Sequence, residues 1–264
     1  MNILLKTARA AAILITSAVA ALAVAGNANA DTVKIGVAAE AYPPFTVPDA
    51  SGNWSGWEID FMHAVCKDQQ MDCKIVPVAW DGIIPALTSG QIDAIVASMG
   101  ITPERRKIIS FSDKYYTSST VVVAPKNIKV DPEPKSLAGK VIGVQVATIY
   151  ERYAQKHLRD STIKTYQSQD EVNQDLISGR IDAVLADGIA LQAFLDSNAG
   201  ACCEIKGEVK RDTDIMPGAG VGIGLRKGED ALKTKFNKGI ANIRANGTYD
   251  AITKKYFDFD VYTD

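Results

Sequence analysis

A twelve-residue pattern occurs twice in the sequence and constrains the fold more than any other feature. The copies span residues 87–98 (LTSGQIDAIVAS) and 176–187 (LISGRIDAVLAD). A shorter echo, Ile-Gly-Val, precedes them at residues 35–37 and 142–144. Solenoid proteins need three or more units, so a pattern that occurs twice predicts two similar lobes, with chance similarity of two amphipathic segments as the alternative.

Apolar runs typical of buried strands alternate with segments of helical periodicity. Residues 33–38, 73–78 and 92–97 have the character of strands, and residues 80–89 have that of a helix. This alternation predicts an α/β fold with mostly parallel strand pairing.

Each copy of the pattern ends in a polar residue, Ser98 in the first and Asp187 in the second. In open α/β sheets, ligands bind beyond the carboxyl ends of the strands. We therefore expect a cleft between two lobes, in which Ser98 and Asp187 face one small polar ligand from opposite sides.

The first thirty residues have the pattern of a secretory signal peptide. Lys6 and Arg9 precede an uncharged run over residues 10–26, and Ala28-Asn29-Ala30 forms a small-x-small cleavage site. The alternative is a membrane anchor, but the run is shorter than the roughly 20 strongly apolar residues of a membrane span. We expect cleavage after Ala30 and export of the mature chain.

The composition argues against a nucleic acid partner, a metal centre and a nucleotide cofactor. The chain has 29 Lys and Arg against 31 Asp and Glu, whereas nucleic acid binding normally needs a basic excess. The two histidines, His63 and His157, are too few for a multi-histidine metal site. Residues 218–224 (GAGVGIG) lack the Lys-Ser/Thr of a phosphate loop, so we interpret them as a hinge strand.

Export favours disulfide bonds among the four cysteines, since the compartment is oxidising. Cys66 closes an expected helix and Cys73 opens an expected strand, so a local bond is plausible, with two buried free thiols as the alternative. Cys202 and Cys203 are adjacent, and a bond between neighbours is strained, so their state stays open.

The segment 56–66 (GWEIDFMHAVC) resembles the signature of solute-binding protein family 3, the periplasmic receptors of ABC importers for polar amino acids. Trp57 departs from the Phe, Tyr, Ile or Leu that is usual there. Further blocks that resemble the family are residues 80–87 (WDGIIPAL), 101–105 (ITPER), 111–114 (FSDK) and 254–262 (KKYFDFDVY). The resemblance covers residues 31–264 and is greatest to the histidine, lysine/arginine/ornithine and opine receptors.

The resemblance implies a type II periplasmic binding protein fold, with a two-strand hinge and a ligand cleft between two lobes. Lobe 1 would comprise residues 31–118 and 220–264, and lobe 2 residues 119–219, after a signal peptide of residues 1–30. It also implies a monomeric periplasmic receptor without a cofactor, which delivers an amino acid or derivative to an ABC permease. The Cys66–Cys73 spacing is similar to a disulfide of the histidine and lysine/arginine/ornithine receptors.

Four residues match the family's binding residues for the amino acid head group, and a fifth position, Gly100, departs from them. Arg105 matches the arginine that binds the α-carboxylate through two parallel N–H bonds. Asp187 matches the carboxylate that holds the α-ammonium, and Ala97 and Ser98 match the pair beside it. Gly100 stands where many relatives have a serine whose hydroxyl helps to hold the ammonium.

The remaining matches concern the ligand side chain and a loop of lobe 2. Tyr42 and Trp80 match the aromatic pair that encloses the ligand side chain. Thr148 and Ile149 lie in a loop whose backbone N–H groups reach the carboxylate, where Ala147-Thr148-Ile149 replaces the commoner Gly-Thr-Thr. This change and Gly100 each remove one hydroxyl group from the surroundings of the head group. An N-substituted amino acid would tolerate that loss.

Glu40 completes the predicted site. The family's acid lies one position earlier, where this chain has Ala39, and one step along an extended segment turns a side chain to the other face. If Glu40 faces the cleft, a cationic side chain is favoured, so we expect a basic amino acid or an opine-like ligand. The alternative is a dehydratase-type enzyme on the same fold, for which Glu40 is the only evident general acid; we expect no catalytic residues.

Overall fold

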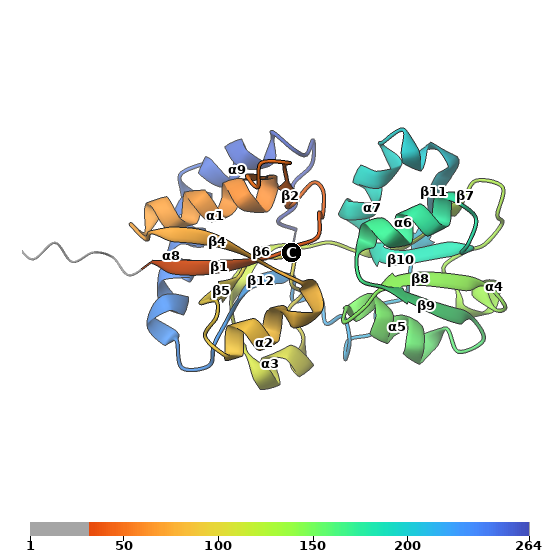
Figure 1. The fold of residues 1–264 in the computed structure, drawn as a ribbon, viewed down its shortest axis with the longest axis horizontal. Helices are drawn as coiled ribbons and strands as arrows, with labels where there is room; N and C mark the ends of the chain where they lie inside the picture. Colours follow the sequence, from red (N-terminus) through yellow and green to blue (C-terminus); the bar gives the residue numbers. More distant parts are fainter. Residues whose placement is uncertain (1–31, 264) are drawn as a thin grey trace, which may run out of the picture.

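Two five-stranded sheets, each covered by helices on both faces, make up the computed structural model (Figure 1). The structure describes residues 32–263. The predicted signal peptide and its cleavage after Ala30 therefore lie outside the described residues. None of the helices in residues 32–263 combines the length and the apolar character needed to cross a membrane.

The first lobe is built on a sheet with the strand order β4-β1-β5-β12-β6. These strands are β1 (Val33–Ala38), β4 (Cys73–Val78), β5 (Ala94–Ile95), β6 (Ser110–Tyr116) and β12 (Val221–Leu225). A small hairpin joins β2 (Val47–Pro48) to β3 (Trp54–Ser55). The helices of this lobe are α1 (Trp57–Asp68), the 3₁₀ turn η1 (Trp80–Gly82), α2 (Ile83–Thr88), α3 (Pro103–Ile108), α8 (Asp230–Ala245) and α9 (Thr248–Thr253).

The second lobe repeats this plan with the strand order β11-β7-β10-β8-β9. Its strands are β7 (Thr120–Pro125), β8 (Val141–Gln145), β9 (Thr162–Tyr166), β10 (Ala183–Asp187) and β11 (Cys203–Glu208). Its helices are α4 (Pro134–Leu137), α5 (Ile149–His157), α6 (Gln169–Ile177), α7 (Gly188–Leu195) and the 3₁₀ turn η2 (Ala199–Cys202).

The chain passes between the two lobes twice, over residues 117–119 between β6 and β7 and over residues 209–220 between β11 and β12. Figure 1 shows the lobes side by side with these segments between them. The lobe boundaries expected at 118/119 and 219/220 fall in the two crossings, and the division of the chain at these points stays a prediction.

Strand pairing is mixed, so the expectation of mostly parallel sheets was wrong. In each sheet the central βα strands pair in parallel, β1 with β4 and β5, and β8 with β9 and β10. Beside them, β12 is antiparallel to β5 and β6, and β7 is antiparallel to β10 and β11. Only strands joined by crossover helices must run in parallel, whereas β7 and β12 enter their sheets directly from the other lobe.

The aspartate of the repeated pattern serves the same structural role in both lobes. The Asp93 N–H donates to the Lys34 carbonyl at 2.8 Å, and Asp93 Oδ2 accepts the Lys34 N–H at 2.9 Å. Asp182 makes the same two bonds with Val141, both at 2.8 Å. The repeated aspartates thus join the start of one parallel strand to its neighbour.

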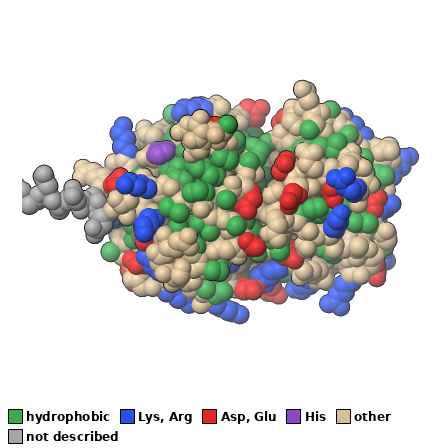
Figure 2. Space-filling model, in the orientation of Figure 1, with side chains coloured by type: hydrophobic (Ala, Val, Ile, Leu, Met, Phe, Trp, Pro, Cys, Tyr) green, Lys and Arg blue, Asp and Glu red, His purple; other side chains and the backbone are tan. Residues whose placement is uncertain are grey.

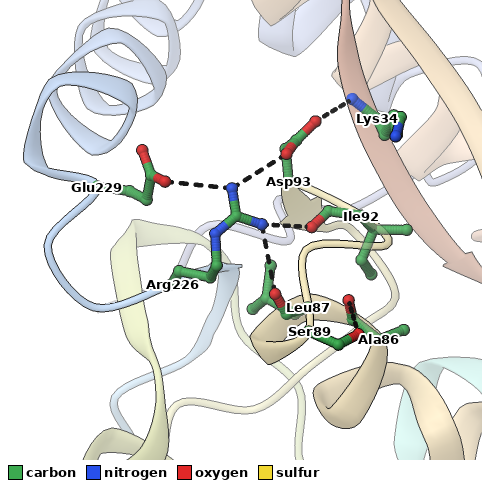
Figure 3. A network of polar contacts seen from close by, with 8 residues as sticks. All are labelled: Lys34, Ala86, Leu87, Ser89, Ile92, Asp93, Arg226 and Glu229. Atoms are coloured by element: carbon green, nitrogen blue, oxygen red, sulfur yellow. Dashed lines mark hydrogen bonds and ion pairs between the residues drawn. The ribbon is translucent and has the colours of Figure 1, made fainter.

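In the first lobe an arginine reinforces this junction (Figure 3). The Arg226 guanidinium bonds to Asp93 at 3.0 Å, to Glu229 at 3.1 Å and to the Ile92 carbonyl at 2.6 Å. Because Arg226 follows β12, this network fixes the end of the returning strand to the first copy of the pattern.

The Ile-Gly-Val echo also has a packing reason. A Cβ atom on Gly36 would lie 2.3 Å from Cδ1 of Ile92, and one on Gly143 would lie 2.5 Å from Cδ1 of Ile181. Ile92 and Ile181 are the isoleucines of the repeated pattern, and both are buried. The glycine of each echo therefore makes room for the isoleucine of the pattern that follows it.

The departure at Trp57 is explained by an aromatic cluster under α1. Trp57 is fully buried, and its ring lies 5.5 Å from that of Phe61 and 6.1 Å from that of Tyr115. Its indole N–H donates to the Thr253 hydroxyl of α9 at 3.1 Å. The larger ring fills this space and leaves no polar atom of its own unsatisfied.

Both cysteine pairs are bonded in the structure. The predicted Cys66–Cys73 disulfide is confirmed, and it joins the last turn of α1 to the first residue of β4. Cys202 and Cys203, whose state the sequence left open, are also bonded to each other, at the junction of η2 and β11.

Candidate functional site

A cavity of about 240 Å³ lies between the lobes, at the carboxyl ends of β5 and β10. The structure brings every residue of the predicted binding site to its wall: Glu40, Tyr42, Trp80, Ala97, Ser98, Gly100, Arg105, Thr148, Ile149 and Asp187. The ends of the two copies of the repeated pattern thus line one space, as the strand-end argument expects.

Arg105 presents a buried positive charge to this cavity. Helix α3 begins after Thr102, whose hydroxyl accepts the Arg105 N–H at 3.1 Å and so fixes the first turn. The guanidinium donates to the Gly100 carbonyl at 3.0 Å and, across the cleft, to the Ala147 carbonyl at 3.3 Å. It lies 5.4 Å from the centre of the Trp80 ring. Burial lowers the pKa of Arg105 to about 10, so the side chain stays charged at neutral pH.

Asp187 presents a buried negative charge from the other lobe. Its Oδ1 caps helix α7 by accepting the N–H groups of Ile189 at 2.9 Å and Ala190 at 3.1 Å. Its Oδ2 accepts the hydroxyl of Tyr150 at 3.4 Å. Burial raises the pKa of Asp187 above its ordinary value, although these bonds oppose the rise. Within residues 32–263, no lysine, arginine or histidine forms an ion pair with Asp187.

The start of α5 contributes backbone donors to the cavity. The Thr148 hydroxyl accepts the Glu151 N–H at 3.1 Å and donates to the Gln145 carbonyl at 2.7 Å, so this hydroxyl is committed to the helix cap. Ile149 is the first residue of the helix and also lines the cavity. The amides at this helix end carry a partial positive charge that suits a carboxylate.

The opposite wall of the cavity is aromatic and carries a carboxylate. Tyr42 and Trp80 are both half-buried and line the cavity, together with Glu40 and not with Ala39. The Glu40 carboxylate accepts the backbone N–H of Trp80 at 3.2 and 3.4 Å, at the start of η1. The one-residue offset therefore does not turn Glu40 away from the cleft.

Gly100 leaves space beside the head-group residues. A Cβ atom there would lie 3.7 Å from both the Arg105 guanidinium and Cδ1 of Ile149, which is ordinary contact. Ser98, two residues earlier, has a left-handed φ of 51°, which is uncommon for a residue with a side chain. The cavity wall here therefore has free space beside Gly100 and a constrained backbone at Ser98.

Sequence reasoning missed several cavity residues, mostly on the two crossings and at the start of lobe 2 helices. Tyr150 directly follows the predicted residues Thr148 and Ile149 but was given no role, although its hydroxyl donates to Asp187. The two crossings have no periodic pattern of apolar residues, so the sequence contains no signal that their side chains line the cavity. The missed lining residues include Ser118, Ser119, Thr120, Gln145, Tyr150, Gln169, Arg211 and Met216.

The arrangement complements a small zwitterion. A cation from one lobe and an anion from the other face the same cavity, and neither is neutralised by an ion pair within the described chain. Figure 2 shows further acidic side chains beside the boundary between the lobes, which favours the approach of a cation. Residues 32–263 contain no group of three or more His, Cys, Asp or Glu side chains that could hold a metal.

Comparison with known proteins agrees with this geometry. The model of the bacterial extracellular solute-binding proteins, family 3, matches residues 33–259. The L-arginine-binding protein of Pseudomonas aeruginosa is 40% identical over 233 residues, 87% of this chain and 89% of the relative. The lysine/arginine/ornithine-binding periplasmic protein of Escherichia coli is 39% identical over 237 residues, 89% of this chain and 90% of the relative.

Solved structures with the same fold include two ancestral proteins. An ancestral arginine-binding protein bound to arginine has a TM-score of 0.78 and 35% identity, covering 86% of this chain and 98% of its own. An ancestral amino acid-binding protein, a precursor of cyclohexadienyl dehydratase, has a TM-score of 0.76 and 30% identity, covering 86% and 95%. The resemblance and the fold class expected from the sequence are both confirmed.

Proposed function

This chain belongs to the bacterial extracellular solute-binding proteins of family 3, and we infer that it is a receptor that binds a free amino acid between its lobes. The observation that carries this inference is the pair of opposite charges, Arg105 and Asp187, that face one cavity from different lobes. An amino acid carries the complementary charges on its α-carboxylate and α-ammonium. A ligand held by both lobes favours the state in which they are close together.

We assign the head group of the ligand as follows. Arg105 binds the α-carboxylate, supported by the amides at Thr148 and Ile149, because a guanidinium and a helix N-terminus both suit an anion. Asp187 binds the α-ammonium together with Ser98. The role of Ala97 and Gly100 is to leave room beside these groups, since neither carries a polar side chain.

We favour a basic amino acid as the ligand. Tyr42 and Trp80 offer aromatic faces to a cationic side chain, and Glu40 offers a carboxylate on the same wall. The named ligands of two relatives, arginine and the lysine/arginine/ornithine group, support this choice. The space at Gly100 keeps an opine-like, N-substituted amino acid as the second candidate.

The test is a binding measurement on protein that has been unfolded and refolded, so that any retained ligand is removed. Arginine, lysine, ornithine, histidine, glutamine, alanine and an opine are compared by calorimetry and thermal shift. Ligand at a hundredfold excess over Kd should stabilise the protein by about 2.7 kcal/mol. We expect the basic amino acids to bind most tightly. Absence of binding by every compound would overturn the receptor assignment, and tighter binding of alanine would overturn the side-chain preference.

We also propose how the receptor is placed in the cell. The leader directs export to the periplasm and is removed after Ala30, and the lobes of residues 31–118 with 220–264 and of residues 119–219 move about the two crossings. The liganded monomer then delivers its ligand to an ABC permease. Mass spectrometry of the secreted protein should give Asp31 as the first residue, and size-exclusion chromatography with light scattering should give a single-chain mass.

A catalytic role is the less favoured proposal. The relatives are binding proteins by name, and one structural neighbour is a precursor of a dehydratase. Glu40 lines the cavity and is the one general acid that the sequence suggests for such chemistry. Incubation with prephenate and arogenate, followed by product analysis, tests the point; we expect both compounds to be recovered unchanged.

A further inference from the structure

A buried carboxyl lies in the first lobe directly behind the ligand cavity. Glu58, in the first turn of α1, is fully buried. Its Oε1 accepts the backbone N–H of Ser98 at 2.7 Å and also the hydroxyl of Tyr115. Its other oxygen, Oε2, has no hydrogen-bond partner in the part of the chain that the structure describes.

The groups around Glu58 supply no compensating positive charge. No lysine, arginine or histidine of residues 32–263 forms an ion pair with it. The ionisable groups that face it are Tyr42, Tyr115, Tyr116 and, from the second lobe, Asp187. Burial raises the pKa of Glu58 to about 7, Asp187 adds to the rise, and the bonds from Tyr115 and Ser98 oppose it.

The contact with Ser98 connects this carboxyl to the site. Ser98 lines the cavity and adopts a left-handed φ of 51°. A residue with a side chain holds this conformation only where its surroundings determine it, and the Glu58 bond to its N–H is such a restraint. The hydroxyl of Ser98 has no partner of its own within the described residues.

We propose that Glu58 is a positioning residue, which orients Ser98 toward the ligand ammonium and makes amino acid binding release a proton from the first lobe. The proposal rests on the proposed function, because it needs the α-ammonium between Ser98 and Asp187. The physical reason is electrostatic: a cation at that place stabilises the ionised carboxylate in surroundings that otherwise penalise it. Binding and ionisation of Glu58 therefore favour each other.

Because ligand binding and proton release are linked, the affinity for the ligand should rise with pH. In the free protein, Glu58 is mostly protonated below its pKa of about 7, so binding there must displace a proton and affinity is lower. Between pH 6 and pH 8 the affinity for L-arginine should rise about tenfold, because the protonated fraction of a group with this pKa falls from about nine tenths to about one tenth. Both cationic groups of L-arginine stay protonated over this range.

The experiment compares wild type, Glu58→Gln and Glu204→Gln by calorimetry with L-arginine at pH 6, 7 and 8, in two buffers of different ionisation enthalpy. The glutamine at position 58 keeps an oxygen that can accept both hydrogen bonds but cannot titrate. We expect the wild type and Glu204→Gln, a change on an exposed side chain of β11, to show the pH dependence and proton release. Glu58→Gln should bind with nearly constant affinity, and any residual slope belongs to Asp187, which this variant retains.

A second variant keeps the proposal testable if Glu58→Gln does not fold. Tyr115→Phe removes the hydroxyl that donates to Glu58, so the pH dependence should move to higher pH. The proposal is overturned if wild-type affinity changes less than twofold between pH 6 and pH 8, or if Glu58→Gln keeps the wild-type profile. If wild type binds neither L-arginine nor any other amino acid at any pH, the proposed function fails instead.

Discussion

At the scale of single residues, the site depends on side chains that serve the fold and the cavity together. Asp187 uses one carboxylate oxygen to cap α7 and presents the other toward Tyr150 and the cavity. Arg105 holds two carbonyls, one in each lobe, while it lines the same space. Substitutions here therefore need controls that separate lost binding from lost stability.

Arg105→Ala should weaken binding of the preferred amino acid by several hundredfold or more. The change leaves a buried ligand carboxylate without its cation, which costs roughly 3–5 kcal/mol. Arg106→Ala is the matched control, since Arg106 is the exposed next residue and does not line the cavity. Calorimetry that finds Arg105→Ala within threefold of wild type would show that the head-group assignment is wrong.

Gly100→Ser should be tolerated and should strengthen binding of an unsubstituted amino acid by about fivefold. The new Cβ would make only ordinary contacts at 3.7 Å, and a hydroxyl beside the ammonium adds a hydrogen bond worth about 1 kcal/mol. An N-substituted ligand should lose affinity, because the side chain fills the space that its substituent needs. Isothermal titration with arginine and an opine checks both effects; equal changes for the two ligands would contradict this use of the space.

At the scale of elements, short local ties hold the framework that the site needs. Helix α1 carries Glu58 in its first turn and Cys66 in its last turn. The disulfide from Cys66 to β4 therefore fixes the helix that positions Glu58. The repeated aspartates play a comparable role between parallel strands. These ties lie away from the cavity wall, and their loss should affect stability more than ligand choice.

Replacement of Cys66 and Cys73 by serine should lower the free energy of unfolding by about 2–3 kcal/mol without changing the order of ligand affinities. The bond closes a short loop and restrains mainly the unfolded chain. The control is the double serine variant at Cys202 and Cys203, which closes no loop beyond two neighbouring residues and should change stability less. Denaturant titration measures both, and a reordered ligand series in the Cys66/Cys73 variant would contradict a purely structural role.

At the scale of the whole molecule, few polar contacts within residues 32–263 join the lobes directly across the cleft. Arg105 donates to the Ala147 carbonyl, and the Glu104 carboxylate of α3 pairs with Arg152 of α5. The Glu104–Arg152 pair is partly exposed, with 53% and 37% of the two side chains accessible. Such a pair adds little free energy and is screened by salt.

Glu104→Gln should therefore weaken ligand binding by no more than about fivefold, mainly through faster release. The effect should disappear at high salt, whereas the loss in Arg105→Ala should remain. Stopped-flow release of arginine at low and high ionic strength measures the difference. A salt-independent loss would mean that Glu104 contacts the ligand or the site rather than the facing lobe.

The features that the sequence alone determined are those that depend on short segments. The repeated pattern predicted two similar lobes, and the strand-end argument placed Ser98 and Asp187 on one cavity, which the structure shows. The helix expected over residues 80–89 is present as η1 and α2. Local periodicity is a property of neighbouring residues, so it can be recognised without knowledge of the tertiary structure.

Only the tertiary structure decided which distant residues meet. The antiparallel insertion of β12 between β5 and β6 joins segments over a hundred residues apart, and no local pattern encodes that pairing. Glu58 lies 40 residues before Ser98 and 57 before Tyr115, yet its carboxylate accepts a hydrogen bond from each of them. Burial away from any compensating positive charge raises the pKa of Glu58 to about 7, and burial is a property of the packed lobe. The sequence therefore determined the framework and the charges of the site, while packing decided their protonation and their contacts across the cleft.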